Sequence, residues 1–290
     1  MDLRRLRLFL AVVDEGGMTR AAAAEHVSQP SVSQAVRELE AELGTSLFHR
    51  TGRTLVLTAA GEALVGPARQ ALRDVETGRA AVEAVAGLDA GRLDLGALPT
   101  LAIDPLAPLV GAFRRAHPRV TIALADPPDT ASLEQLVATA ACEVALTVTT
   151  PSDADLVALP LGAQDLLAVL PPGTPIPGPA LPITALAGFP LVTAPVGTAT
   201  RSQLEDAFSA AGLLPDIAVE ASQREAILPL VLAGAGATLY PRALADQAAR
   251  LGASVVPLRP RLTRPVSLLH RRGTLSPAAS AFVELAATAR

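Results

Sequence analysis

The stretch from residue 19 to residue 42 constrains the fold most, because it predicts two helices joined by a tight corner at residues 27–29. Thr19 can cap a first helix rich in alanine, which has a high helix propensity and lets another helix approach closely. Ser28 can accept hydrogen bonds from the first turn of the second helix, where Pro30 costs no hydrogen bond. We therefore expect a compact helical corner whose second helix follows Ser28.

The second helix has two different faces. Apolar residues recur along it at helical spacing and predict one buried stripe: Val32, Val36, Leu39 and Leu43. The opposite face carries hydrogen-bonding groups and one guanidinium: Pro30, Gln34, Arg37 and Ala41, with Ser33 and Glu38 on its flanks. Such a face is typical of a helix that enters the major groove of DNA and contacts base edges. A solvated face on an ordinary helix pair has the same composition, so this segment alone leaves both interpretations open.

Residues 47–58 predict a β-hairpin, because two short β-prone runs flank a turn at residues 51–53. Its tip presents His49, Arg50 and Arg53, and a cationic tip beside a reading helix suits phosphate or minor-groove contact. A plain solubilising turn is the alternative. The candidate DNA-contacting residues are Gln29, Pro30, Ser31, Ser33, Gln34, Arg37, Arg50 and Arg53.

Residues 59–88 predict one long helix with a heptad-like seam. The seam consists of Leu64, Ala68, Ala71, Val75, Gly78, Val82 and Val85. Pro67 should kink this helix or mark its first full turn, because its ring displaces the hydrogen bond to the carbonyl of Ala63. A seam of this kind usually pairs two helices, so we expect a dimer that places two reading helices on successive turns of one DNA face.

Composition limits where a nucleic-acid surface can lie and in which compartment the chain works. The net charge is -4 and all 24 basic residues are arginine, so any cationic surface must be local. Cys142 is the only cysteine, which excludes an intramolecular disulfide and fits a reducing cytoplasm. The first ten residues lack a signal-peptide pattern, and prolines interrupt the uncharged stretch 166–200, so we expect a cytoplasmic protein without a membrane span.

Many residues of the N-terminal part together match a known family. They are Thr19-Arg20-Ala21-Ala22, Val27-Ser28-Gln29-Pro30, Ser33, Leu39-Glu40, Leu43-Gly44, Leu47-Phe48, Arg50, Leu57-Thr58 and Gly61. With these residues, the first 88 positions resemble the DNA-binding domain and linker helix of the LysR-type transcriptional regulators. The resemblance implies a winged helix-turn-helix that binds double-stranded promoter DNA, a homodimer through the linker helix, often a homotetramer, and a response to a small-molecule effector. Two positions depart from the family: Glu25 replaces a usual leucine, and Met18 replaces a frequent phenylalanine.

The rest of the chain alternates strands and helices, which predicts an α/β fold with parallel sheets covered by helices. Strands are expected at 93–97, 120–124, 143–148, 156–161, 190–194, 216–220, 236–240, 254–258 and 265–270, and helices at 105–116, 131–140, 201–211, 223–233 and after Ser276. This pattern is similar to the two-lobed, Rossmann-like (periplasmic-binding-protein-like) effector domain of the same family.

The expected domain division is 1–58 for the winged helix-turn-helix, 59–88 for the linker and dimerisation helix, and 89–290 for the effector-binding domain. By resemblance, lobe I comprises 92–161 and 266–290, and lobe II comprises 162–265. The chain would cross between the lobes near 161–164 and 264–266, and these crossings would act as a hinge.

An effector cleft is expected where strands end and helices begin. In lobe I the candidates are Pro99, Thr100, Leu101, Thr147 and Thr149; in lobe II they are Thr198, Arg201 and Gln223, the last followed by Arg224. Simple turn and cap chemistry is the alternative interpretation of each residue. Arg201 or Arg224 could meet a carboxylate, so we expect a small organic acid or related metabolite.

Catalytic residues, metal ligands and cofactor motifs are not found in the sequence. The four histidines lack metal-ligand spacing, Gly234 and Gly236 lack the third glycine of a dinucleotide loop, and a phosphate-binding loop is impossible without lysine. Two hypotheses therefore stand. The chain is an allosteric, non-enzymatic regulator, or it is a fused enzyme or metabolite-binding module whose N-terminal helices serve only assembly.

Overall fold

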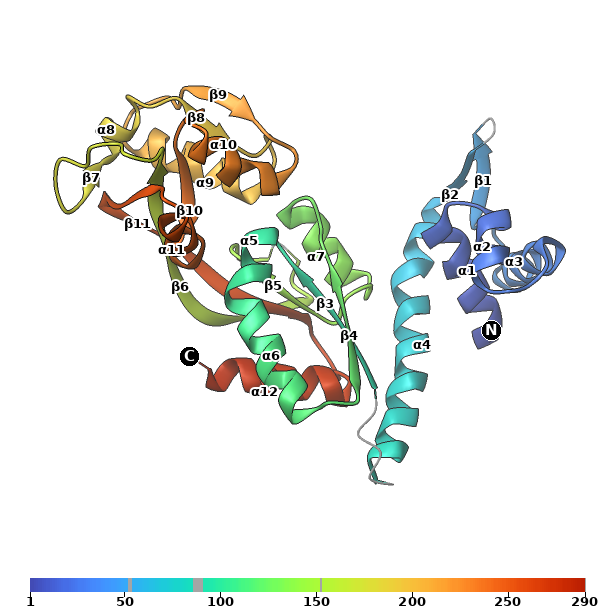
Figure 1. Ribbon diagram of the computed structural model, residues 1–290. Coiled ribbons are helices and arrows are strands. Elements are labelled where there is room, and N and C mark those ends of the chain that lie inside the picture. Colours follow the sequence, from blue (N-terminus) through green and yellow to red (C-terminus); the bar gives the residue numbers. More distant parts are fainter. Residues whose placement is uncertain (52–53, 86–90, 152, 290) are drawn as a thin grey trace.

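The computed structural model describes residues 1–51, 54–85, 91–151 and 153–289 (Figure 1). A small helical domain with a hairpin is joined through one long helix to a larger, two-lobed α/β domain. The N-terminal elements are α1 (Leu3–Glu15), α2 (Met18–Ala24), α3 (Gln29–Leu43), β1 (Phe48–Thr51), β2 (Thr54–Leu57) and α4 (Ala59–Val85).

Local signals place the N-terminal helices. Asp2 caps α1 by accepting from the Arg4 amide at 3.2 Å. Ser28 caps α3 by accepting from the Ser31 amide at 3.3 Å, as predicted. The prediction that Thr19 caps α2 is wrong, since α2 begins at Met18 after Gly17 and has no side-chain cap.

The helix-turn-helix packs around α1. Phe9 is fully buried and its ring centroid lies 5.5 Å from that of Phe48 at the base of the hairpin. Of the predicted stripe, Leu39 is buried in the same cluster as Phe9, and Val32 and Val36 are buried in the adjoining cluster with Val12. Leu43 is 40% exposed, so the prediction that it belongs to the buried stripe is wrong; it is the last residue of α3.

The seam of α4 divides into two parts. Leu64, Ala68 and Ala71 pack in the same cluster as Phe9, so this part of the seam contributes to the core of the protomer, and the pairing of two chains through the seam stays a prediction. Val75 is 40% exposed. The reason is that α1 lies against the first turns of α4 and extends no further along it. Pro67 lies within the continuous helix.

The larger domain contains the remaining elements. Those of the first half are β3 (Gly91–Ala97), α5 (Pro99–Leu101), η1 (Ala102–Leu106), which is kinked at Asp104, α6 (Ala107–Ala116), β4 (Val120–Ala125), α7 (Thr130–Ala138), β5 (Val144–Thr147) and β6 (Leu156–Leu170). The second half contains β7 (Leu181–Pro182), α8 (Ile183–Leu186), β8 (Leu191–Thr193), α9 (Ala199–Ala210), β9 (Ile217–Glu220), the 3-10 helix η2 (Arg224–Ala226), α10 (Ile227–Leu232), β10 (Thr238–Pro241), α11 (Arg242–Arg250), β11 (Ser254–Arg271) and α12 (Pro277–Thr288).

The main sheet has the strand order β10-β6-β11-β5-β3-β4 and mixes two directions. Strand β3 pairs in parallel with β4 and β5, whereas β11 pairs antiparallel with β5 and β6, and β10 pairs antiparallel with β6. The expectation of purely parallel sheets is therefore wrong. The cause is that the predicted strand at 156–161 continues to Leu170 and the predicted strands at 254–258 and 265–270 form one strand, so that β6 and β11 each run through both lobes (Figure 1).

The crossing between the lobes is thus a two-stranded antiparallel ribbon, in which Gly162 pairs with Val266 and Gln164 pairs with Arg264. Register shifts occur next to Pro257 and Val266, where proline interrupts the ladder and hides the continuity in the sequence.

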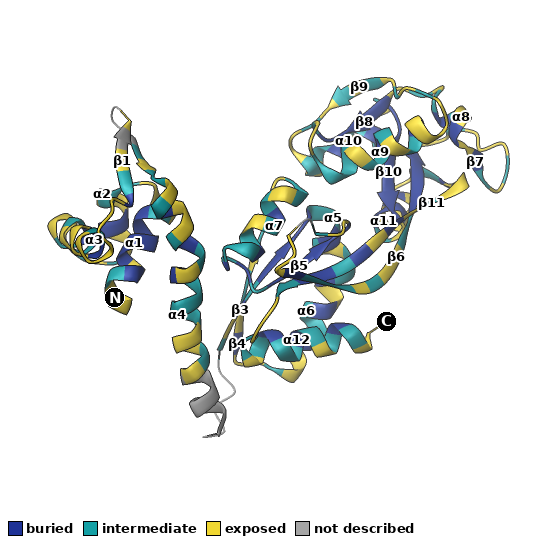
Figure 2. Ribbon diagram, turned by 180° about the vertical axis from the view of Figure 1, so that it is seen from behind, coloured by how far each residue is buried: buried dark blue, intermediate teal, exposed yellow. Residues whose placement is uncertain are grey.

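Each lobe has its own core, and buried residues follow β5 in one lobe and β10 in the other (Figure 2). Phe113 and Phe282 pack edge to face at 5.5 Å in the first. Phe208 is fully buried in the second. The cleft described below lies where these two cores face each other.

Candidate nucleic-acid interface and inter-lobe cleft

The outer face of α3 is available for contact. Gln29, Pro30, Gln34 and Arg37 are all exposed. The Gln34 amide donates to the Glu38 carboxylate at 2.8 Å, and the Arg37 guanidinium donates to the Ser33 hydroxyl at 3.1 Å. These bonds run along the helix surface, where neighbouring turns meet, and each can be exchanged for a bond to a base edge.

Some of the predicted residues surround one hollow of about 620 Å³ between the start of α2, helix α3 and the hairpin. Gln29, Ser33 and Arg37 line it from α3, and His49 lines it from β1. Ser31 is half-buried and its hydroxyl bonds the Ser28 hydroxyl at 2.8 Å, so it belongs to the helix cap.

The predicted hairpin cations are described only in part. Arg53 lies outside the described residues, and Arg50 is described through its backbone in β1 alone. At the corner before α3, Glu25 is the half-buried C-cap of α2 and does not enter the helical core. This position removes the desolvation cost that a carboxylate would carry in the place of a leucine.

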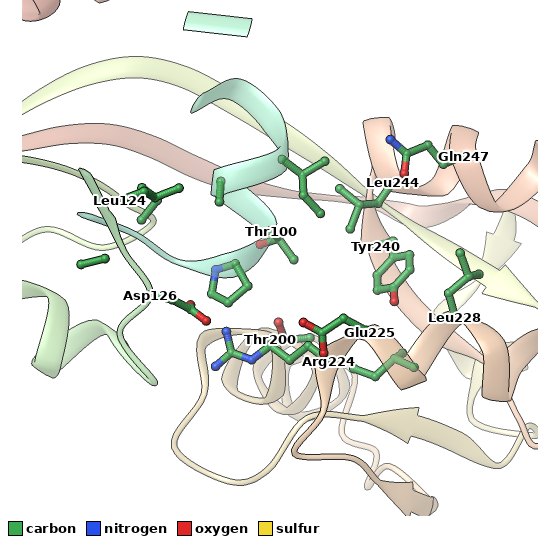
Figure 3. A pocket seen from close by; sticks show the side chains of 16 residues that line it. Thr100, Leu124, Asp126, Thr200, Arg224, Glu225, Leu228, Tyr240, Leu244 and Gln247 are labelled. Carbon is green, nitrogen blue, oxygen red and sulfur yellow. The ribbon is translucent and has the colours of Figure 1, made fainter. Parts of the chain in front are cut away.

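A cleft of about 400 Å³ lies between the two lobes (Figure 3). From lobe I it is lined by Ala97, Pro99, Thr100, Ala102, Ile103, Leu124, Ala125 and Asp126, and from lobe II by Thr200, Arg224, Glu225, Ile227, Leu228, Tyr240, Leu244 and Gln247. Ile103 is 45% exposed and Leu124 is 53% exposed, so both present apolar surface to the cleft. A volume of this kind with apolar walls suits a small organic molecule.

Of the predicted effector contacts, Pro99 and Thr100 line the cleft. Leu101 does not, because it is fully buried in the core of lobe I. Thr147 is fully buried and lies 3.2 Å from the hydroxyl of the exposed Thr149, so this pair closes a strand end and does not line the cleft.

The three effector contacts predicted in lobe II, Thr198, Arg201 and Gln223, are not among the residues that line the cleft. Thr198 caps α9 by accepting from the Arg201 amide at 3.3 Å, which is the alternative cap interpretation. Arg201 forms ion pairs with Glu205 at 2.7 Å and Glu220 at 3.2 Å, so its charge is already neutralised. Gln223 is exposed outside the cleft lining.

Arg224 does line the cleft, but its guanidinium donates to the carbonyl of Pro128 at 2.6 Å. Tyr240 forms part of the opposite wall, and burial raises the pKa of its phenol to about 12. The phenol therefore stays protonated at neutral pH and supplies an apolar ring to the cleft.

Arg264 of β11 is a residue that the sequence predictions missed. It is 4% exposed and donates to Gln164 at 2.8 Å, Thr100 at 2.9 Å and Gln203 at 3.3 Å. Burial lowers the pKa of its guanidinium to about 10, while the charge of Asp104 acts in the opposite direction. A signal was available, since Arg264 has the same strand parity as the buried Val266 and therefore lies on the apolar face.

Other chemistry finds no support in the described part of the chain. No group of three His, Cys, Asp or Glu side chains there could hold a metal ion. None of the described helices combines the length and apolarity that a bilayer crossing needs. Cys142 is buried, and burial raises the pKa of its thiol to about 11.

The fold and the two sites define a class: DNA-binding regulators that carry a separate small-molecule domain. Residues 3–62 match the family described as "Bacterial regulatory helix-turn-helix protein, lysR family", and residues 86–290 match "LysR substrate binding domain". The chain belongs to the LysR family of transcriptional regulators. It is therefore a DNA-binding regulator with an effector-binding domain, and the hypothesis of a fused enzyme is wrong.

Relatives along nearly the whole chain agree with this. The nitrogen assimilation regulatory protein nac of Klebsiella aerogenes is 32% identical, over 98% of this chain and 94% of that protein. A probable hydrogen peroxide-inducible genes activator of Mycobacterium avium is 33% identical, over 92% of this chain and 86% of that protein. A full-length OxyR variant from Pseudomonas aeruginosa has a similar structure, with a TM-score of 0.78 and 25% identity over 99% of this chain and 94% of that one.

Proposed function

We propose that this regulator binds promoter DNA as a homodimer in the cytoplasm and that a small molecule in the inter-lobe cleft controls the binding. One observation carries the proposal: the polar face of α3 is exposed in a chain that also has a cleft lined from two lobes. We propose the same domain division as above. The proposed DNA contacts are Gln29, Pro30, Ser31, Ser33, Gln34, Arg37, Arg50 and Arg53.

The proposed effector site differs from the set predicted from the sequence. It keeps Pro99 and Thr100, and it adds the residues that line the cleft from lobe II, among them Arg224 and Tyr240. A ligand that contacts both lobes favours the arrangement in which both contacts exist, and the ribbon of β6 and β11 is where the chain can bend. Lobe closure would then change how the subunits, and with them the reading helices, are arranged.

We propose that the dimer forms through the part of α4 beyond the α1 contact, where Val75 and Gly78 are exposed. Further pairing of dimers would give a homotetramer. Two copies related by a two-fold axis would place their α3 helices in successive major grooves.

Although the chain is similar to a peroxide-inducible activator, we propose that it does not respond to oxidants through a cysteine thiol. Cys142 is the only cysteine among the 290 residues, and it is buried. A thiol with a pKa of about 11 is almost entirely protonated at neutral pH and reacts slowly with oxidants. We expect the effector to be a bound molecule and not an oxidant.

A gel shift with the region upstream of the protein's own gene tests the proposal, first alone and then with a panel of small metabolites. Arg37→Ala should weaken binding, because it removes a cation from the exposed face of α3. Arg259→Ala is the matched control: it removes the same charge from an exposed position in β11 and should leave binding unchanged. Equal losses in both variants, or binding that no metabolite alters, would contradict the proposal.

A further inference from the structure

The charge of Arg264 lies directly behind the cleft and has neutral oxygen atoms as its hydrogen-bond partners. Its Nε donates to Gln164 Oε1 at 3.0 Å, and Nη2 donates to the same atom at 2.8 Å. Nη2 also donates to Thr100 Oγ1 at 2.9 Å, and Nη1 donates to Gln203 Oε1 at 3.3 Å. These neutral oxygen atoms satisfy the N–H groups of the guanidinium but do not cancel its positive charge.

The carboxylate of Asp104 does not contact the guanidinium of Arg264, because Gln164 lies between them. Asp104 accepts from Gln164 Nε2 at 2.8 Å, so the amide of Gln164 stands between the carboxylate and the guanidinium. Within the described residues, Arg264 has no carboxylate at ion-pair distance. Burial of an incompletely paired cation is costly, and an anion nearby would offset that cost.

Thr100 connects this charge to the cleft. Its hydroxyl oxygen accepts a hydrogen bond from Arg264, so its own hydrogen remains to be donated to another acceptor. Thr100 is half-buried and lines the cleft, between Asp126 on one side and Tyr240 on the other (Figure 3). A ligand oxygen placed there would meet a donor backed by a positive charge.

We propose that the effector is an organic anion whose carboxylate accepts a hydrogen bond from Thr100, and that Arg264 selects for the negative charge through this hydroxyl. The inference rests on the proposed function of the cleft. The body of the ligand would lie against the apolar side chains of Ile103, Leu124 and Leu228. The arginines predicted for this role are engaged elsewhere: Arg201 by two glutamates and Arg224 by the Pro128 carbonyl.

The acidic residues of the cleft do not reverse this preference. Asp126 and Glu225 are exposed, so water and salt screen their repulsion of an anion. Arg264 is 4% exposed, so its attraction acts through protein of lower effective dielectric and is less screened.

The test uses the full-length protein and matched pairs of simple compounds: benzoate with benzamide, 3-phenylpropionate with its amide, and hexanoate with its amide. Benzylamine provides the cationic member. Isothermal titration should show that at least one acid binds and that it binds about tenfold or more tightly than its amide. Arg264→Gln should remove this preference, because the amide keeps hydrogen bonds but lacks the charge.

Two further variants separate charge selection from damage to the fold. Arg264→Lys restores the charge and should restore the preference for acids, although with weaker binding. Arg259→Met removes an exposed charge from the same strand and should change nothing. Thr100→Ala should weaken the binding of acids and amides alike, since both present an acceptor to the lost hydroxyl.

The inference is overturned if no acid binds, if acid and amide bind equally, if benzylamine binds best, or if Arg264→Gln keeps the preference for acids. These results differ from failure of the proposed function. DNA binding that responds to a neutral or cationic compound would leave the regulator intact and refute only the selection of an anion.

Discussion

A methyl group added at Gly61 should destabilise the DNA-binding domain even though it replaces glycine by the best helix former. Gly61 lies in the first turn of α4, where its amide donates to the Thr58 hydroxyl at 3.1 Å. A Cβ at this position would lie 2.2 Å from the carbonyl oxygen of Leu47 and 2.7 Å from Leu57 Cδ2. The close approach of α4 to the base of the hairpin therefore depends on the absence of a side chain.

The sign of the effect follows from two opposing terms. Alanine in place of glycine stabilises a helix interior by about 1 kcal/mol. Forcing an extra carbon into a packed site costs about 1–3 kcal/mol. The upper part of that range applies, because the Leu47 carbonyl accepts from the Thr58 amide at 2.9 Å and cannot turn away freely. We expect Gly61→Ala to lower the free energy of unfolding by about 1–2 kcal/mol.

Gly66→Ala is the matched control in the same helix, because a Cβ there would lie 3.8 Å from the nearest protein atoms, the Ala138 carbonyl oxygen and Thr139 Cα, which is ordinary van der Waals contact. It should leave the free energy of unfolding unchanged or raise it by up to about 1 kcal/mol. Urea unfolding followed by far-UV circular dichroism measures both variants against the wild type. A Gly61→Ala protein as stable as the wild type would refute the close packing of α4 on the hairpin.

Four more outcomes are expected. Gln34→Ala should reduce discrimination between the operator and single-base variants of it by about 1–3 kcal/mol. Arg53→Ala should instead weaken binding to all DNA sequences alike and lower the slope of log K against log salt concentration by about one phosphate contact. Binding isotherms at several salt concentrations measure both effects. The Cys142 thiol should resist iodoacetamide in the folded protein and react in urea, which mass spectrometry detects, because burial raises its pKa to about 11. Asp129→Ala should cost about 1 kcal/mol by removing the N-cap of α7, which accepts from the Ser132 amide at 2.7 Å. That hydrogen bond lowers the pKa of Asp129 in the folded protein. The ionised carboxylate therefore stabilises the fold fully above the unfolded pKa of about 3.9, and this stabilisation is lost as the pH falls through the lower folded pKa. Equal unfolding free energies of the wild type and the variant at neutral pH would refute the cap.

The parts of the fold that depend on neighbouring residues could be predicted from the sequence. The cap at Ser28 and the stripe from Val32 to Leu39 fix α3 within one segment, and the structure confirms both. The continuity of β6 and β11 could not be predicted, because it depends on pairing between strands about a hundred residues apart. Prolines such as Pro257 and Pro265 interrupt the local pattern although the strand continues past them.

Only some of the residues of the candidate cleft could be predicted, because its geometry also depends on contacts between residues that are far apart in the sequence. Thr100 follows a strand and could be assigned to the cleft from its position alone. Arg201 has the same kind of position, but Glu220 from another strand neutralises it. Arg264 finds its partners 61, 100 and 164 residues away, so no local pattern could show that its charge lies beneath Thr100.

The geometry also connects the cleft to the DNA-binding domain within one chain. Ala125, the last residue of β4, and Asp126, which follows it, line the cleft and also a second cavity of about 500 Å³. Val65 and Arg69 of α4 line this second cavity as well. The same segment is held from lobe II by the hydrogen bond from Arg224 to the Pro128 carbonyl. If lobe II moves when a ligand binds, as proposed above, the movement would act on a segment that borders α4. Because packed elements shift as units, we expect such a displacement to reach α4, and with it the DNA-binding domain, without passing through the ribbon of β6 and β11.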